Sequence, residues 1–509
     1  MRGIVTRAWI GGLTGLAAAV AIAGCGGLGE QGGRSGRSGA DEWRLPNADA
    51  HNSRRVGGPI DASSVRRLRV AWTVPIGPVV ANPVVARGVV YVQDMNSNMA
   101  AIALGSGRRL WSQSFEEPSV GPNGVAVVGD RVYGATATEA FAERARTGEL
   151  LWTRRLVANA HEGIDMAPGI WRDGVYLSTV PVNRRATYGA GGRGTLWALD
   201  AATGRPRWRW MTVPKDLWGR PDVNSGGGLW HPPAFDEAGR LYASVGNPGP
   251  WAGTPRYPWG SSRLGPNRWT NSLVKLDART GRFAWGRQVL PHDLYDWDLE
   301  CPPILTRASG RALVVVAGKM GFVYAFERAS GRLVWKRAVG RHNGHDADGR
   351  KTMSGRALRR GERVLPGQLG GVETPMAVDG EHVYVPVENL ASTYDGVQQG
   401  RSDPLLDAGT GELVALDLAT GRVAWDRRLP ESAWGGVVVV NDLVFTPTFE
   451  GTVWALRTAD GSVAWRTHLP AGVNAPLAVA GDTLIAAAGQ PLEAGQRAGI
   501  VAYRLTSGG

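Results

Sequence analysis

Acidic side chains gather in one short run of the chain, PHDLYDWDLECPP, which extends from Pro291 to Pro303. Four carboxyl groups fall within eight positions there, directly after a histidine. A carboxylate held in a site can take a proton from a substrate, so this run is a candidate source of a general base. The four acids are Asp293, Asp296, Asp298 and Glu300.

Three other runs combine glycine with aromatic or polar residues. They read GGGLWHPP from Gly226, VGNPGPW from Val245 and AGKMGFVYAFERASG from Ala317. Glycine lets the backbone approach a ligand closely, and an indole offers a flat stacking face, so a flat, ring-shaped ligand would need such runs. Lys319 is one of only five lysines among 57 basic residues, which favours a role for its compact ammonium group. A salt bridge to a neighbouring element explains it equally well.

A repeated element must position these runs. Seven times a turn glycine is followed, after three residues, by a tryptophan, as in ALDLATGRVAW. The fullest copies show an alternating strand, a D/E-x-x-T/S-G turn and a second strand, which is typical of a hairpin. Such repetition indicates a radial repeat fold. The pairs are Gly107–Trp111, Gly148–Trp152, Gly204–Trp208, Gly281–Trp285, Gly331–Trp335, Gly421–Trp425 and Gly461–Trp465.

An eighth tryptophan completes the count. Trp72 lies 39 residues before Trp111 but lacks the upstream hairpin, and after Trp465 the chain offers three strands with no tryptophan strand to follow. We therefore expect the strand at Trp72 to complete the last sheet. The prediction is an all-β, eight-bladed β-propeller of four-stranded blades, closed by its N-terminal strand, which leaves only short protected edges. A solenoid or several sandwiches is the alternative.

Long insertions place the function on part of this ring. From Trp111 onward the intervals between tryptophans are 41, 56, 77, 50, 90 and 40 residues, so blades three to six carry the long loops. Loops on a rigid scaffold commonly carry function. The net charge of +12 comes from arginines scattered over hairpin turns, not from a basic stripe with interleaved aromatics, which argues against a nucleic-acid partner.

The N-terminus predicts export. Residues 1–25 begin with two arginines and continue with an apolar stretch that is short for a membrane span. They end in Ile-Ala-Gly-Cys, which resembles the lipobox of bacterial lipoproteins and predicts a lipid on Cys25 that anchors the protein to the cell-envelope membrane. Secretion with cleavage elsewhere is the alternative. We expect residues 26–65 to form a flexible, glycine-rich tether and residues 66–506 to form the propeller.

The interior runs carry a family resemblance. From about Leu68 to Leu505 the chain resembles the alcohol dehydrogenases that depend on pyrroloquinoline quinone (PQQ), which are eight-bladed propellers with tryptophan docking motifs. Outer-membrane assembly lipoproteins share the repeat without binding quinone, so the interior runs are the more specific signal. The resemblance implies that Trp230 forms the floor under PQQ, that Asn247 ligates Ca²⁺ and that Lys319 contacts the cofactor. It also places Trp434 at the edge of the pocket.

The chain departs from the family pattern at the centre. The family's catalytic aspartate sits in a run like R-P-G-D-N, whereas residues 263–267 read RLGPN, which places Pro266 at the base position. The glutamate that ligates the metal corresponds most closely to Asn183. Because Ca²⁺ prefers several oxygens that include carboxylates, Asn183 and Asn247 alone predict weakened metal binding.

Another acid could replace the missing base. Active family members carry PHD-x-x-D beside their normal base, which favours a bracing role for Asp293 and Asp296. Asp298 and Glu300 are therefore the candidate catalytic residues.

Two interpretations remain open. The first is a membrane-anchored, quinoprotein-type oxidoreductase that binds PQQ, with Ca²⁺, and oxidises an alcohol-like donor. Its electrons would pass to a separate acceptor, because the sequence holds no C-x-x-C-H haem motif. The second is a non-catalytic propeller lipoprotein that acts as an envelope scaffold or binding protein, and Pro266 and Asn183 favour it. The sequence leaves the substrate, the acceptor and the oligomeric state open.

Overall fold

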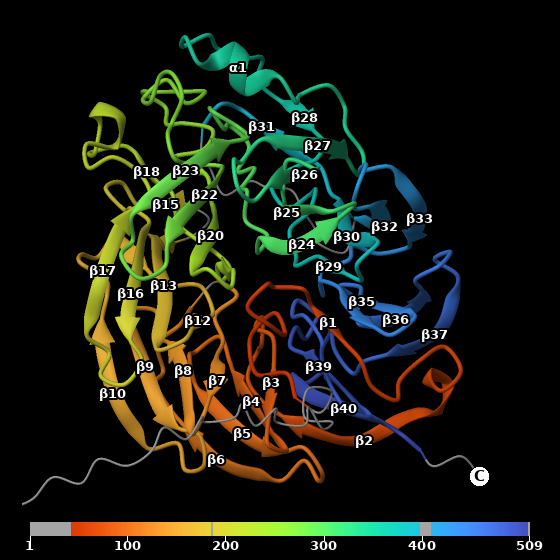
Figure 1. The fold of residues 1–509 in the computed structure, drawn as a ribbon. Helices are drawn as coiled ribbons and strands as arrows, with labels where there is room; N and C mark the ends of the chain where they lie inside the picture. The colour runs from red at the N-terminus through yellow and green to blue at the C-terminus, as the bar shows by residue number, and fades with distance from the viewer. Residues whose placement is uncertain (1–41, 120, 185–186, 398–408, 507–509) are drawn as a thin grey trace, which may run out of the picture. The chain divides into compact units, whose positions relative to one another are not determined.

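The computed structural model describes residues 42–119, 121–184, 187–397 and 409–506, and these residues belong to one compact unit. The predicted signal sequence, its Cys25 and the first part of the predicted tether lie outside the described residues. Eight antiparallel sheets follow one another around a centre, as Figure 1 shows. The predicted eight-bladed, all-β propeller is confirmed.

The first four blades each pair their strands in order from the centre outward. They consist of β3 (Val84–Ala86), β4 (Val89–Gln93), β5 (Met99–Ala103) and β6 (Arg109–Gln113); β7 (Ala126–Val128), β8 (Arg131–Ala135), β9 (Glu139–Arg144) and β10 (Leu150–Arg155); β12 (Gly169–Trp171), β13 (Gly174–Pro181), β16 (Thr195–Asp200) and β17 (Pro206–Met211); and β19 (Ala234–Phe235), β20 (Arg240–Val245), β22 (Ser272–Asp277) and β23 (Phe283–Gln288).

The other four blades repeat this order. They consist of β24 (Ile304–Ala308), β25 (Arg311–Gly318), β26 (Phe322–Glu327) and β27 (Leu333–Ala338); β29 (Ala377–Val378), β30 (His382–Asn389), β32 (Thr410–Asp417) and β33 (Val423–Leu429); β34 (Val438–Val440), β35 (Leu443–Pro447), β36 (Thr452–Arg457) and β37 (Val463–His468); and β38 (Ala478–Ala480), β39 (Thr483–Ala488), β40 (Gly499–Leu505) and β2 (Leu68–Pro75).

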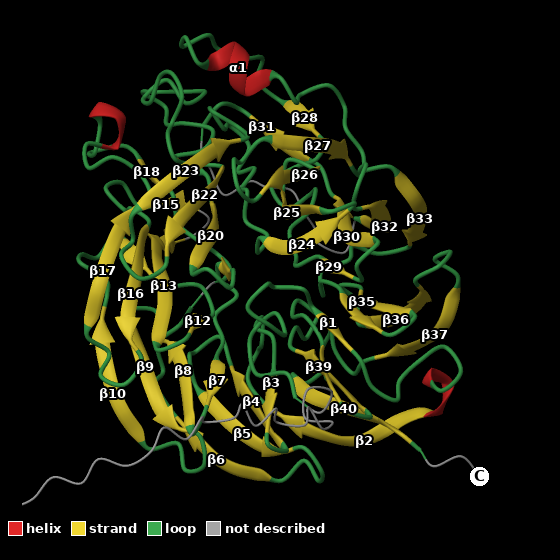
Figure 2. Cartoon of the chain, in the orientation of Figure 1, coloured by secondary structure: helices red, strands yellow, loops and turns green. Residues whose placement is uncertain are grey.

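The remaining elements are short and lie in the connections. They are β1 (Arg55–Val56), β11 (Glu162–Gly163), β14 (Asn183–Arg184), β15 (Thr187–Tyr188), β18 (Ser225–Gly226), β21 (Pro248–Gly249), β28 (Glu362–Val364), β31 (Ser392–Tyr394), the 3₁₀ helices Val65–Arg67 and Leu217–Gly219, and α1 (Asp348–Thr352). Figure 2 shows how little helix the described residues contain. None of these helices has the length and apolar character needed to cross a bilayer.

Tryptophans join neighbouring blades as the repeat predicts. The indole of Trp72 lies on Gly107 of the next hairpin, and a Cβ at that glycine would come within 2.8 Å of the ring. The indole N–H of Trp72 also donates to the carbonyl of Leu104 at 2.8 Å. Gly107 adopts a φ of +73°, so both its backbone and its neighbour require glycine. The same contact recurs at Gly148, Gly204, Gly281, Gly331, Gly421 and Gly461.

The ring closes between the two ends of the propeller sequence. Strand β2 pairs antiparallel with β40, from Leu68 opposite Leu505 to Pro75 opposite Gly499. This pairing confirms the closure expected from the spacing of Trp72. Trp465, in the outermost strand of the preceding blade, packs edge-on against Tyr503 of β40 with ring centroids 5.8 Å apart.

The N-terminal segment differs from the prediction. The expected tether ended at residue 65, but the described residues from 42 onward belong to the propeller. Trp43 and Arg54 are fully buried. We call residues 43–56 the central plug, because their backbone carbonyls accept hydrogen bonds from the innermost strands. The donors include the N–H groups of Val127, Phe235, Leu305, Val378 and Val439, at 2.8–3.1 Å. The segment is ordered because innermost strands leave unpaired N–H groups that need acceptors.

Candidate functional site

A cavity of about 300 Å³ lies where the blades converge. All blades except the third contribute to its lining, and most contributions come from the residues that lead into an innermost strand. Examples are Val80 before β3, His231 before β19, Thr374 before β29 and Pro476 before β38. The repeat therefore brings together segments that are hundreds of residues apart, and the walls of the cavity differ from blade to blade.

Four of the residues predicted from the sequence line this cavity, namely Trp230, Glu300, Lys319 and Trp434. Lys319 is 5 % exposed and Trp434 also 5 %, so the cavity reaches deep into the ring.

Three predicted site residues lie elsewhere. Asn247 and Asp298 are not part of the cavity lining, although both touch residues near it. Asn183 belongs to the short strand β14, and its side chain lies outside the described part of the molecule.

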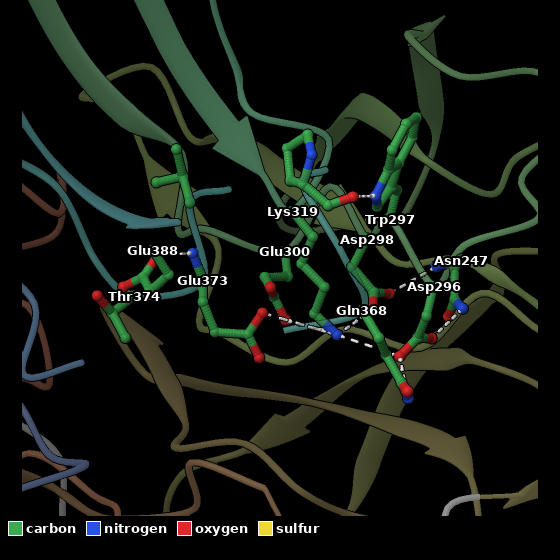
Figure 3. A network of polar contacts seen from close by, with 12 residues as sticks. Asn247, Asp296, Trp297, Asp298, Glu300, Lys319, Gln368, Glu373, Thr374 and Glu388 are labelled. Atoms are coloured by element: carbon green, nitrogen blue, oxygen red, sulfur yellow. Dashed lines mark hydrogen bonds and ion pairs between the residues drawn. The ribbon is translucent and has the colours of Figure 1, made fainter. Parts of the chain in front are cut away.

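An acidic cluster surrounds the ammonium group of Lys319 (Figure 3). The Lys319 Nζ atom lies 3.0 Å from a carboxylate oxygen of Asp298, 3.4 Å from Asp296, 3.8 Å from Glu373 and 4.0 Å from Glu300. Figure 3 shows Glu373 and Asp296 on opposite sides of this ammonium. Four carboxyl groups thus share one cation. We use the name acidic cluster for these five residues.

Three of these acids lie in the loop between β23 and β24, and hydrogen bonds from other segments hold two of them, Asp298 and Asp296, in place. Asp298 accepts a hydrogen bond from the backbone N–H of Asn247 at 2.7 Å, and its carbonyl accepts one from the N–H of Lys319 at 3.0 Å. Both of its carboxylate oxygens are therefore engaged. Asp296 accepts from the side-chain amides of Asn247 and Gln368. Asp298 is a structural brace, whereas Asp296 faces the cavity.

Asp293 braces the same loop, as expected. Its carboxylate accepts hydrogen bonds from the backbone N–H groups of Tyr295 and Trp297, both at 2.9 Å. Burial raises the pKa of Asp293 to about 7. It does not line the cavity.

Burial shifts Asp296, Glu300 and Glu373 toward their protonated forms. It raises the pKa of Asp296 to about 6 and that of Glu373 to about 7, although the Lys319 ammonium opposes both shifts. The pKa of Glu300 is raised well above its usual value by burial and by the neighbouring Glu373. Burial works against the charge on Lys319, but the carboxylates, Asp296 first, raise its pKa well above the usual value. At neutral pH the ammonium is charged and the carboxyl groups compete for protons.

His231 forms a neutral part of the wall. Burial lowers its pKa to about 3, and the positive charge of Arg54 acts in the same direction. His231 therefore carries no charge near neutral pH, and the positive charge of Arg54 in the central plug helps to keep it neutral.

The position expected for the family's base is not in the cavity. Pro266 is exposed and is absent from the lining, while the neighbouring Arg263 is fully buried and donates to the carbonyls of Trp251 and Asp293. The loop is thus held by its arginine. The acids of the cavity come from other segments.

Sequence reasoning missed Glu373, Gln368 and His231. A signal existed for two of them, because a proline precedes most innermost strands, as in HPPAF, ECPPIL and ETPMAV. The residues that directly precede these prolines line the cavity in two of the cases. They are His231 in one blade, and Glu373 and Thr374 in another. Gln368 lies in a long connection with no such mark.

The histidine-rich run from residue 342 is braced by its own acids. His342 Nδ1 lies 2.9 Å from Asp346 Oδ1, and His345 Nδ1 lies 2.7 Å from Asp348 Oδ2. Among the described residues, no group of three or more His, Cys, Asp or Glu side chains is arranged as a preformed metal site.

Comparison with known proteins agrees with this architecture. The family model of the "Glucose/ethanol/alcohol dehydrogenase, beta-propeller domain" matches residues 160–352. The model of the "Outer membrane protein assembly factor BamB" matches residues 67–180 and 319–509, which is more than half of the chain. The class of protein is therefore a tryptophan-docked propeller with PQQ-type repeats. The chain belongs to the family of this second model, and its residues 160–352 are similar to the propeller domain of glucose, ethanol and alcohol dehydrogenases.

Individual relatives support the same assignment. The chain is 28 % identical over 468 residues to the quinohemoprotein alcohol dehydrogenase of Comamonas testosteroni. This alignment covers 77 % of this chain and 64 % of that protein. It is 31 % identical over 314 residues to quinohemoprotein alcohol dehydrogenase ADH IIB of Pseudomonas putida, covering 54 % of this chain and 44 % of that protein. The chain thus spans less than two thirds of either relative.

Solved structures share the fold. The Comamonas testosteroni enzyme superposes with a TM-score of 0.78 at 22 % identity, covering 92 % of this chain and 81 % of that one. BamB from Moraxella catarrhalis gives a TM-score of 0.53 at 14 % identity, covering 87 % of this chain and 99 % of that one.

Proposed function

We propose that this protein is a quinoprotein-type oxidoreductase that binds PQQ in the central cavity and oxidises an alcohol-like donor. The convergence of Trp230, Lys319 and Trp434 on one cavity of about 300 Å³ carries the proposal. That volume lies within the range of small-molecule and cofactor sites. The relatives named above, which are alcohol dehydrogenases with quinone cofactors, support the same chemistry.

The residues of the cavity fit a planar quinone in shape and in polar groups. Trp230 offers a flat face, Lys319 offers a charged donor, and the indole N–H of Trp434 is buried without a hydrogen-bond partner. PQQ carries three carboxylates, and the wall already carries Asp296, Glu300 and Glu373. A cation such as Ca²⁺ would offset these negative charges. We propose Asn247, which lies beside Asp296, as one of its ligands, and Asn183, whose side chain lies outside the described residues, as the second candidate.

Bound PQQ supplies the two-electron acceptor for the oxidation of an alcohol to a carbonyl compound. The chain's own residues have to orient the donor and accept its proton. Asp296 faces the cavity with a pKa of about 6, which leaves it largely ionised at neutral pH and suited to this task. Glu300, which also lines the cavity, is the second candidate, whereas Asp298 does not line it.

Titration with PQQ, with and without Ca²⁺, tests this function. We expect saturable quenching of tryptophan fluorescence and a higher thermal midpoint, because a ligand that binds only the native state stabilises it by about 2.7 kcal/mol at a hundredfold excess over its dissociation constant. Trp230→Ala should abolish the quenching. Trp218→Ala is the control, because Trp218 is half-buried outside the cavity and its indole N–H donates to the carbonyl of Arg268. Absence of binding at high PQQ with Ca²⁺ present contradicts the proposal.

The proposed setting is the cell envelope, with a lipid on Cys25 and a separate electron acceptor. Metabolic labelling with a palmitate analogue, compared between the wild type and Cys25→Ala, tests the anchor. The match to the BamB model favours one alternative, a non-catalytic envelope scaffold. Two results together would support that alternative. The protein would fail to bind PQQ, and it would co-purify with envelope proteins from the membrane fraction only when Cys25 is present.

A further inference from the structure

The lining of the cavity carries more acidic side chains than basic ones. Three carboxyl groups line it, and the one ammonium among them, on Lys319, is already shared with Asp298 behind the wall. If all the carboxyl groups of the acidic cluster are ionised, four negative charges face one positive charge. Such a wall attracts a cation and repels an anion.

Glu300 and Glu373 form the part of this wall that is least satisfied. Both lie farther from the Lys319 ammonium than the two aspartates do, at 4.0 and 3.8 Å. The carboxyl groups of Glu300 and Glu373 hydrogen-bond each other. Glu300 is 6 % exposed, and its Oε1 atom has no hydrogen-bond partner, while Oε2 of Glu373 has only the Lys319 ammonium at 3.8 Å. A buried carboxylate oxygen without a donor is costly, so both atoms favour a ligand that brings N–H groups.

The indole of Trp434 lines the same cavity as these carboxyl groups. Thr374, next to Glu373, donates a hydrogen bond at 3.1 Å to the carbonyl of Ala433, next to Trp434. Trp434 lines the cavity and packs with Leu390 and Phe449. Carboxylates next to an indole face and apolar packing are the features that recognise an alkylammonium group, through charge-assisted hydrogen bonds, cation–π attraction and contact with its methylene groups.

We propose that Glu300, Glu373 and Trp434 form a subsite for an ammonium group, and that the donor oxidised by this protein is an amino alcohol. This inference rests on the proposed function for the oxidation itself. The ammonium end binds the two glutamates, and the hydroxyl end remains free for the acceptor side of the cavity. A neutral alcohol lacks the charge for this subsite, and a hydroxy acid is repelled by it.

Calorimetric titration tests the subsite on the full-length chain, once as purified and once after incubation with PQQ and Ca²⁺. The ligands are 5-amino-1-pentanol, its neutral isostere 1-hexanol and 6-hydroxyhexanoate. We expect the amino alcohol to bind at least tenfold more tightly than 1-hexanol and the hydroxy acid to bind most weakly. Equal affinities for the amino alcohol and for 1-hexanol overturn the inference without the use of any variant.

Variants then assign the preference to residues. Glu373→Gln and Glu300→Gln should each reduce the preference for the amino alcohol at least fivefold. Glu143→Gln is the matched control, because Glu143 is a fully buried glutamate in β9 that does not line the cavity. A preference that survives in both cavity variants overturns the assignment.

PQQ binding is scored separately in the same samples. Retained preference for the amino alcohol without PQQ binding refutes the proposed function and supports the subsite. PQQ binding with no preference refutes the subsite alone.

Discussion

Replacement of Arg54 by methionine should destabilise the whole propeller, although the residue lies far from any hairpin turn. Its guanidinium is fully buried in the central plug. It donates to the carbonyl of Val437 at 2.6 Å and to that of Leu477 at 3.1 Å, which belong to blades seven and eight. It also donates to the side-chain oxygens of Asn47 and Asn82, both at 3.0 Å. One side chain thus links the plug to two neighbouring blades.

The magnitude follows from what the substitution leaves behind. Methionine fills most of the space but donates no hydrogen bond, so several buried acceptors lose their partner, at about 1–3 kcal/mol each. Part of this loss is offset, because burial of the charge is itself unfavourable and lowers the pKa of Arg54 to about 9. We expect a net loss of about 3–5 kcal/mol. With about 2.1 cal/mol/K of unfolding entropy per residue over about 470 residues, the thermal midpoint should fall by about 3–5 °C.

Thermal unfolding followed by circular dichroism or calorimetry measures this change. Arg359→Met is the matched control, because the Arg359 side chain is 90 % exposed and its ion pair with Glu362 should contribute little. If Arg54→Met lowers the midpoint no further than Arg359→Met does, the plug is not part of the cooperative unit, and the argument from its hydrogen bonds is wrong.

Three further substitutions test the blade junctions and the acidic cluster. Gly281→Ala should lower the free energy of unfolding in urea by about 1–3 kcal/mol more than Gly88→Ala does. Both glycines have φ near +70°, but only a Cβ at Gly281 would meet a ring, that of Trp208 at 2.7 Å. Equal losses would mean that backbone strain alone matters. For Glu373, whose folded pKa of about 7 exceeds its usual 4.5, the protonated form contributes stability that is complete below pH 4.5 and is lost as the pH rises to 7. Glu373→Gln should therefore gain on the wild type by up to about 3 kcal/mol between pH 4.5 and 7, and parallel pH profiles would contradict the shift. Lys319→Met removes the only ammonium of the acidic cluster, so it should destabilise the fold by about 3–5 kcal/mol at pH 7. The loss should be smaller at pH 5, where the acids take up protons. A loss of stability that does not depend on pH would refute the assignment of Lys319 as the partner of these acids.

The ring could be predicted from the sequence because its determinants are local. The glycine turn and the tryptophan four residues later belong to one hairpin, and the contact of Trp72 with Gly107 repeats at a fixed spacing. The plug could not be predicted in this way. Its hydrogen bonds use backbone carbonyls, such as those of Ala50 and Ser53, which leave no mark in the side-chain pattern. A polar segment with glycines on either side therefore predicted a tether.

Only those site residues that lie in a recognisable sequence motif could be predicted from the sequence. Trp230, Lys319 and Trp434 each lie in a run that could be recognised by itself, and all three line the cavity. Glu373 contacts Lys319 from a segment 54 positions further along the chain, and no spacing rule links the two. The closed ring places Glu373 and Lys319 together, because the residues that lead into each innermost strand all lie near its centre.

The departure at Pro266 has a structural consequence for how a base could be supplied. Since Pro266 is exposed and outside the cavity, the missing aspartate does not leave a gap in the wall that one neighbouring acid fills. The acids that face the cavity come instead from the loop before β24 and from the entry to β29, on both sides of Lys319. Because their pKa values are raised by burial, they remain compatible with one another beside a single ammonium. An excess of carboxyl groups is unfavourable for a cavity that holds only an anionic cofactor, and it is favourable for one that also receives a cationic donor.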